Sequence, residues 1–200
     1  MIKAWRLAWL PFVLAAGPAH AHSPIPGIKG FYTGLLHPFS TPSQVLLTIG
    51  LGLLAGGFAT ETERYRLVVF PISGIVGLVV APDIAELDAA MFAAAFAACA
   101  LAALVPGRLH VLAVVLVAAG GFLIGVASIP DDGPVRDRLF TMSGSIVGAS
   151  IGLLYLAGIS LAIRERYTWP WVGIAFRVLS AWLGAISLLM FSLGLAAGET

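Results

Sequence analysis

Six long apolar runs dominate this chain and leave it few ways to fold. Only 10% of its residues are charged, whereas soluble domains carry about 25%. The runs cover roughly residues 43–60, 67–82, 89–106, 111–130, 139–163 and 172–196. Because lipid offers no partner to a free backbone amide or carbonyl, such runs cross a membrane as helices. The sequence therefore predicts an all-α, polytopic bundle of about six transmembrane helices.

The first 21 residues have the pattern of a secretory signal peptide. A basic start is followed by a short apolar run, and Ala19 and Ala21 have the spacing that signal peptidase requires. The run is shorter than the about 20 residues that a span needs. We predict a cleaved signal peptide (1–21), an outer-face leader segment (22–42) and a six-helix transmembrane domain (43–200). The alternative is an uncleaved first helix.

Charges in the loops predict the orientation through the positive-inside rule. With the mature N-terminus outside, the inside loops hold Arg64, Arg66, Arg108, Arg164 and Arg166. The outside segments hold only Lys29, Arg136 and Arg138, together with seven of the ten acidic residues. Those acids either concentrate cations at a site or are simply common on translocated loops. We expect a protein of the bacterial inner (cytoplasmic) membrane, with its mature N-terminus on the periplasmic side.

Glycines are patterned along two of the apolar runs. Gly144, Gly148 and Gly152 repeat every four residues, and Gly121 and Gly125 repeat the spacing in the preceding run. Small residues at this spacing let helices approach closely. We expect them to pack helices inside the bundle. The alternative is that Gly144, Gly148 and Gly152 form a face for a second copy or a membrane partner.

Several function classes lack their residues in this sequence. The net charge of +1 gives no case for a nucleic-acid partner. The cores of the predicted spans carry no Asp, Glu or Lys, which proton-coupled carriers usually hold there. Phosphate-binding loops and dinucleotide fingerprints are absent, and the one cysteine, Cys99, excludes an intrachain disulfide. The sequence therefore predicts that the protein is not an enzyme.

Two histidines are the candidate metal ligands. After cleavage, His22 becomes the N-terminal residue and offers an amine and an imidazole, which suit Cu(II) or Ni(II). His37 lies at the entrance to the first apolar run, whereas His110 is expected to be an interfacial residue on the inner side. The residues that exclude a continuous helix between the first two are Pro24, Pro26, Gly27 and Gly30. We expect a folded-back leader that brings His22 and His37 together; the alternative is an ordinary exposed His22, fixed by the cleavage position, and an interfacial His37 that bonds nearby backbone.

The export signal, the leader and the short spans together resemble the HupE/UreJ family. The likeness is most specific at residues 22–44, which contain the segment Gly-Leu-Leu-His-Pro-Phe-Ser around His37. That family is associated with nickel uptake for hydrogenase and urease maturation. Its first-span motif is His, five residues, then Asp-His. His37 matches the first histidine, and Ser43 and Gln44 stand in place of the aspartate and the second histidine. The later Phe-His-Gly motif of the family has no counterpart here.

The resemblance implies a permease or metal-handling protein for a transition metal, nickel or copper. His22 and His37 would hold the ion, with polar contacts from Ser43 and Gln44. The alternative is a non-transporting accessory protein that binds a metalloenzyme or a partner subunit. In a permease, we expect the polar residues of the spans to line one cavity; these are Ser43, Gln44, Thr48, Ser73 and Ser128.

Overall fold

The computed structural model describes residues 28–58, 60–80, 87–130 and 134–198. The described chain is all-α, as predicted. Its helices are α2 (Ile28–Ser40), α3 (Pro42–Ala55), α4 (Thr60–Val80), α5 (Leu87–Leu104), α6 (His110–Ala127), α7 (Val135–Arg166) and α8 (Pro170–Gly198). Helices α3 to α8 lie where the six apolar runs predicted them. The predicted signal peptide and His22 lie outside the described residues.

The described residues hold four or five candidate membrane spans, where the sequence predicts about six. Four helices, α5 to α8, are long and apolar enough to cross a membrane. Helices α2 and α3 pass the same test only together, and they are bent by 75° at the break between them. Helix α4 has a shorter apolar stretch, Tyr65–Val80. The protein is therefore an integral membrane protein, and its described residues hold four candidate spans, or five if the bent pair counts as one.

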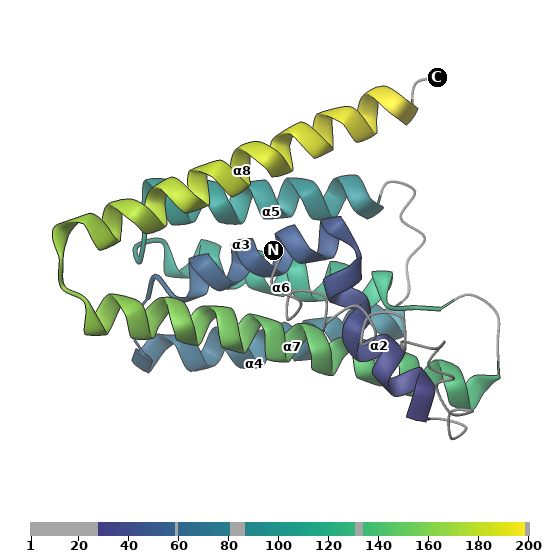
Figure 1. Cartoon of the computed structure of the whole chain (residues 1–200). Helices are drawn as coiled ribbons and strands as arrows, with labels where there is room; N and C mark the ends of the chain where they lie inside the picture. The colour runs from purple at the N-terminus through teal and green to yellow at the C-terminus, as the bar shows by residue number, and fades with distance from the viewer. Residues whose placement is uncertain (1–27, 59, 81–86, 131–133, 199–200) are drawn as a thin grey trace, which may run out of the picture.

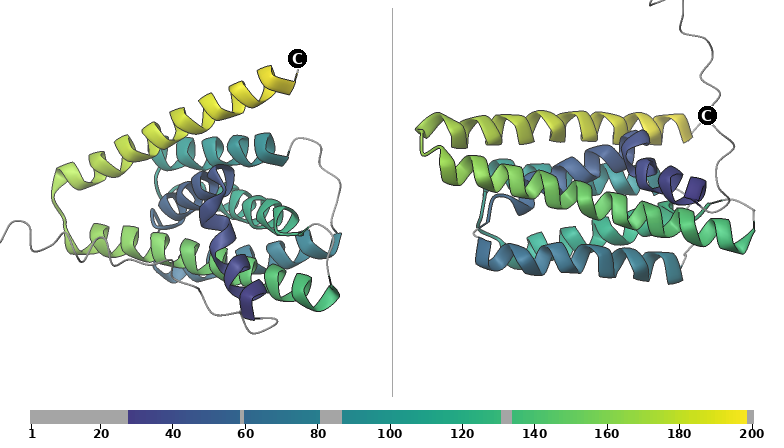
Figure 2. Two further views of the ribbon diagram at one scale, coloured as in Figure 1. Left: turned by 45° about the vertical axis from the view of Figure 1, so that its right-hand side comes forward. Right: turned by 60° about the horizontal axis from the view of Figure 1, so that its bottom comes forward.

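Helix α3 lies at the centre of the bundle (Figure 1). It packs against α5 and α7 and also contacts α6 and α8, while α2 packs on α7, α4 on α6 and α8 on α5. The fully buried residues Leu47, Leu51 and Leu54 of α3 form the middle of the core. Helices α7 and α8 meet at a short turn and then diverge, so α8 leans away from α7 (Figure 2).

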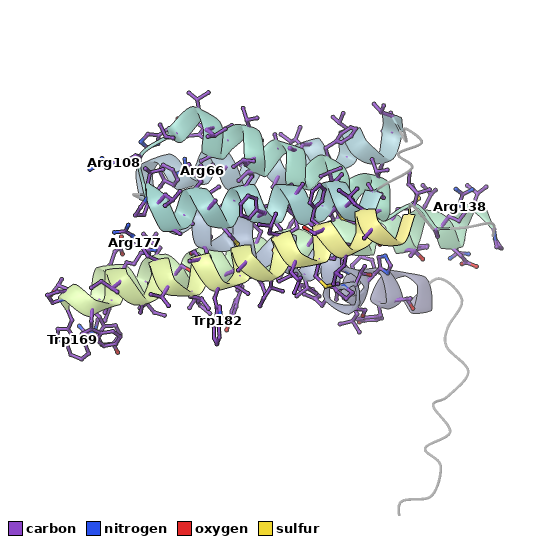
Figure 3. The ribbon with its side chains drawn as sticks, turned by 90° about the horizontal axis from the view of Figure 1, so that it is seen from above. Arg66, Arg108, Arg138, Trp169, Arg177 and Trp182 are labelled. Carbon is purple, nitrogen blue, oxygen red and sulfur yellow. The ribbon has the colours of Figure 1, made fainter. Side chains whose placement is uncertain are left out.

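The two ends of the bundle differ in charge (Figure 3). We call one the histidine end: it holds His37 at the α2–α3 break, the start of α5, the end of α6 and the start of α7. The other is the arginine end, which holds the α3–α4, α5–α6 and α7–α8 turns. Figure 3 shows Arg66, Arg108 and Arg177 at the arginine end and Arg138 at the other. This separation matches the charge pattern predicted for the two sides of a membrane.

The leader differs from its predicted form. Its second half is helix α2, which begins at Ile28 and runs through Gly30. A side chain at Gly30 would meet the backbone of Asp137 and the hydroxyl of Thr141 on α7. Gly30 therefore permits close packing of two helices and does not break α2. Packing against α7 outweighs the conformational cost of a glycine within a helix.

The glycine stripe of α7 is covered by α2. A side chain at Gly144 or Gly148 would collide with the backbone of Phe31 or Leu35, and one at Gly152 would meet the ring of Phe39. The prediction of internal packing is confirmed. The alternative face for a second copy or a membrane partner is wrong, because α2 of the same chain already occupies it. The same device joins α6 to α4, where Gly125 lies against the backbone of Gly74.

Candidate functional site

A cavity of about 400 Å³ opens at the histidine end, where α2, α3 and α5 meet. Its walls combine an imidazole, an amide, a carboxylate and a thioether with apolar groups. The lining residues are His37, Thr41, Gln44, Leu87, Asp88, Met91 and Ala127. Its polar side chains are of the kinds that can bind an ion.

The α2–α3 break places His37 at this cavity. Thr41 precedes Pro42 and has extended backbone angles, φ −105° and ψ 119°. A residue before proline is disfavoured in the helical region, because it clashes with the proline ring. Pro42 itself suits the first turn of α3, where its missing N–H costs no hydrogen bond. The Thr41–Pro42 pair therefore ends α2 and starts α3, which leaves His37 in the last turn of α2.

Gln44 faces His37 across the break. The amide nitrogen of Gln44 lies 3.4 Å from Nε2 of His37. Gln44 is only 2% exposed, and its amide oxygen has no hydrogen-bond partner within the described residues. An unsatisfied buried acceptor costs about 1–3 kcal/mol. A cation bound beside His37 would give this oxygen a partner.

Asp88 brings a carboxylate to the cavity from α5. It lies in the first turn of that helix, where the helix dipole stabilises a negative charge. The hydroxyl of Ser43 donates a hydrogen bond of 2.6 Å to Oδ1 of Asp88. The carboxylate therefore lies beside the position at which the HupE/UreJ motif has its aspartate. Asp88 is one of the seven acids that the charge pattern predicts on the outer side, but nothing in the sequence connects it with His37.

Other polar residues of the spans do not join this cavity. Thr48 lines a separate apolar cavity between α3 and α7, and its hydroxyl has no hydrogen-bond partner in the described chain. Ser128 pairs with Ser145 at 2.7 Å, and Ser73 donates to the carbonyl of Phe70 on its own helix. The expectation for a permease, one cavity lined by all five predicted residues, is therefore not met: only Gln44 lines the cavity with His37.

The remaining histidine lies at the opposite end. His110 is the first residue of α6, and its ring centroid is 4.7 Å from that of Phe58. The guanidinium of the buried Arg66 lies over the ring of Phe58, 3.8 Å from its centroid. His110 therefore belongs to an aromatic contact at the arginine end and not to the cavity of His37.

The donor set of the cavity is small. Within the residues that the structure describes, no three His, Cys, Asp or Glu side chains come together as a metal site. His37 and Asp88 supply two such groups, and Gln44 and Met91 add an amide and a thioether. The pairing predicted between His37 and His22 stays a prediction, because His22 lies outside the described residues.

Comparison with known proteins identifies the family. The model of the family described as HupE / UreJ protein matches residues 10–190. No curated protein and no solved structure matches the chain. The family match covers most of the sequence, including every helix that lines the cavity. On this ground the chain belongs to the HupE/UreJ family.

Proposed function

We propose that this membrane protein captures a transition-metal ion, nickel or copper, in the cavity at the histidine end and serves as a metal permease. The HupE/UreJ family is linked to nickel and cobalt uptake. The observation that carries the proposal is the meeting of His37, Gln44 and Asp88 from three helices at one cavity. Together they offer an imidazole nitrogen, an amide oxygen and a carboxylate.

These donors suit the proposed ions. Imidazole binds nickel and copper well, and thioethers favour the softer Cu(I). The carboxylate of Asp88, held by Ser43, would compensate for the aspartate that the family has at position 43. Met91 lies one turn further along α5 and is buried at the cavity wall. Coordination by the imidazole and carboxylate alone would favour nickel, whereas coordination that includes the thioether of Met91 would favour copper.

In our proposed orientation, the histidine end faces the periplasm and the arginine end the cytoplasm. Arg66, Arg108, Arg164 and Arg166 then lie on the inner side of a bacterial inner membrane, as the positive-inside rule requires. The cavity would open to the outside, where an imported ion arrives. His22 would add its amine and imidazole there.

A second candidate function is a non-transporting accessory protein that binds a metalloenzyme or a partner subunit. It is favoured by the packing beyond the cavity, where Leu47, Leu51 and Leu54 are fully buried. The scattered hydroxyls of Thr48, Ser73 and Ser128 also favour it. Transport would require the helices around α3 to move apart.

Metal binding by the purified full chain in detergent tests the site. We expect His37→Ala and Asp88→Asn to weaken Ni(II) or copper binding by about tenfold or more, since even groups that only orient a metal ligand are worth about 10–100-fold. His110→Ala and Asp137→Asn are matched controls, since they remove the same groups away from the cavity. Equal affinities for all four variants and the parent chain would contradict the site.

Uptake into proteoliposomes separates the two functions. Vesicles that hold a metal-sensitive dye would report entry of Ni(II) or copper. Entry that His37→Ala abolishes supports a permease. Binding without entry supports the accessory function and contradicts transport.

A further inference from the structure

A groove at the arginine end has no part in the proposed metal chemistry. It has a volume of about 460 Å³, and its lining residues all belong to α7, α8 and the turn between them. The walls are almost entirely apolar and include Ile163, Tyr167, Trp171, Phe176 and Leu179. It lies where α7 and α8 begin to diverge (Figure 2). The groove therefore opens between two helices on the outside of the bundle.

Three aromatic rings form one rim of this groove. The ring centroids of Tyr167 and Trp169 are 5.4 Å apart, and those of Trp169 and Trp171 are 5.6 Å apart. All three side chains are about half exposed. Tryptophan and tyrosine are enriched at the headgroup level of membranes, where one part of the ring is wet and the other apolar. The rim therefore marks the depth of the lipid headgroups.

The last turn of α7, which ends next to the lining residue Tyr167, carries two arginines, Arg164 and Arg166. The guanidinium of Arg164 lies 4.3 Å above the ring of Phe176, a wall residue, and its Nε has no hydrogen-bond partner within the described residues. Arg166 ends α7 and is exposed. Arg177 points away and donates from Nε to the carbonyl of Ala103 at 2.7 Å. Glu165 is the only acid on this stretch of α7. The groove thus combines apolar walls with basic residues at the adjoining end of α7.

We propose that an anionic phospholipid binds in this groove, with an acyl chain between α7 and α8 and its phosphate at Arg164 and Arg166. Arginine pairs with phosphate through several charge-assisted hydrogen bonds, and basic pockets between transmembrane helices recognise lipid headgroups. A second copy of the chain fits less well. Two copies in one membrane share an orientation, so the arginine end of one would meet the arginine end of the other. This site lies at the opposite end from the metal cavity and does not depend on it.

Tryptophan fluorescence tests the proposal in the full chain. Trp5 and Trp9 are first replaced by phenylalanine. Trp182→Phe then leaves Trp169 and Trp171 as reporters of the groove. A second variant keeps Trp182 as its only tryptophan, which is an exposed residue of α8 away from the groove lining (Figure 3). Each protein is reconstituted with brominated phosphatidylglycerol or brominated phosphatidylcholine, because bromine quenches the fluorescence of a tryptophan in contact with it.

We expect phosphatidylglycerol to quench the groove reporters at a lower mole fraction than phosphatidylcholine, and to show no preference at Trp182. Arg166→Gln should weaken the preference about fivefold, as should Arg164→Gln, at about 1 kcal/mol for each arginine near a lipid surface. Arg136→Gln at the histidine end should change nothing. Because Arg166 is exposed, its variant tests the site even if Arg164→Gln fails to fold.

Three results would overturn the proposal. The first is equal quenching of the groove reporters by both lipids. The second is a preference that survives both arginine substitutions. The third is a dimer in native mass spectrometry together with no quenching of Trp169 and Trp171 by either lipid. A second copy would then occupy the groove.

Discussion

At the scale of single residues, the cavity combines groups that are far apart in sequence. His37 and Gln44 could be named from the sequence, because both lie at positions of the family's first-span motif. Asp88 could not be connected with them, since only the packing of α5 on α3 brings its carboxylate to Ser43. The sequence shows an acid at the start of an apolar run. It does not show which helix that acid will face.

Restoring the family's second histidine tests the role of position 44. Gln44→His would place a second imidazole next to His37, because the present amide already lies 3.4 Å from its ring. We expect Ni(II) affinity to rise about tenfold, and Gln44→Leu to lower it, since even groups beside a metal ligand change metal affinity by about 10–100-fold. Isothermal titration of the purified protein measures both. Unchanged affinity in both variants would show that residue 44 does not contact the ion.

Removing the Ser43 hydroxyl tests whether it positions Asp88. Ser43→Ala deletes the 2.6 Å hydrogen bond but leaves the carboxylate in place. We expect about tenfold weaker Ni(II) binding, the usual cost of losing a group that orients a ligand. Ser40→Ala is the control, because its hydroxyl bonds the carbonyl of Leu36 outside the cavity. A loss of the same size in both variants would count against a positioning role.

At the scale of helices, the sequence predicted positions well and the path of the leader poorly. Apolar runs locate α3 to α8, because burial in lipid requires a long apolar helix. In the leader, Gly30 and its neighbours predict a break in the helix. That glycine instead serves the contact of α2 with α7. Whether a glycine breaks a helix or packs it depends on a partner surface that is distant in sequence.

A pair of glycine substitutions in α7 tests this packing. Gly148→Ala places a methyl group against the backbone of Leu35, whereas Gly158→Ala meets nothing within 4 Å. We expect the first to lower stability by about 1–3 kcal/mol, the usual cost of overpacking. The second should be neutral or stabilising, since alanine favours helix more than glycine does. Thermal unfolding in detergent compares them, and equal effects would contradict the α2–α7 contact.

At the scale of the whole molecule, charge separates the two ends of the bundle. The sequence predicted this separation, because loop charges follow from the order of the spans. The structure adds that the cavity and the arginine end lie at opposite ends. In the proposed permease, an ion that enters at His37 must therefore pass the buried leucines of α3 to reach the other side.

Cysteine labelling tests the orientation in cells. Cys99 is buried, so the parent chain should react little with a membrane-impermeant maleimide. We expect Ser40→Cys at the histidine end to be labelled from outside, and Arg108→Cys at the arginine end to react only after lysis. The reverse pattern would contradict the proposed orientation and would place the cavity on the cytoplasmic side.

The location of a bound metal tests the central claim most directly. Crystals of the full chain grown with Ni(II) or copper would give an anomalous difference peak at the ion. We predict a peak within bonding distance of both His37 and Asp88, at about 2.0–2.2 Å from the donor atoms as for similar transition-metal ions. A peak elsewhere, or none in crystals soaked at saturating metal, would contradict the proposed metal site at the histidine end.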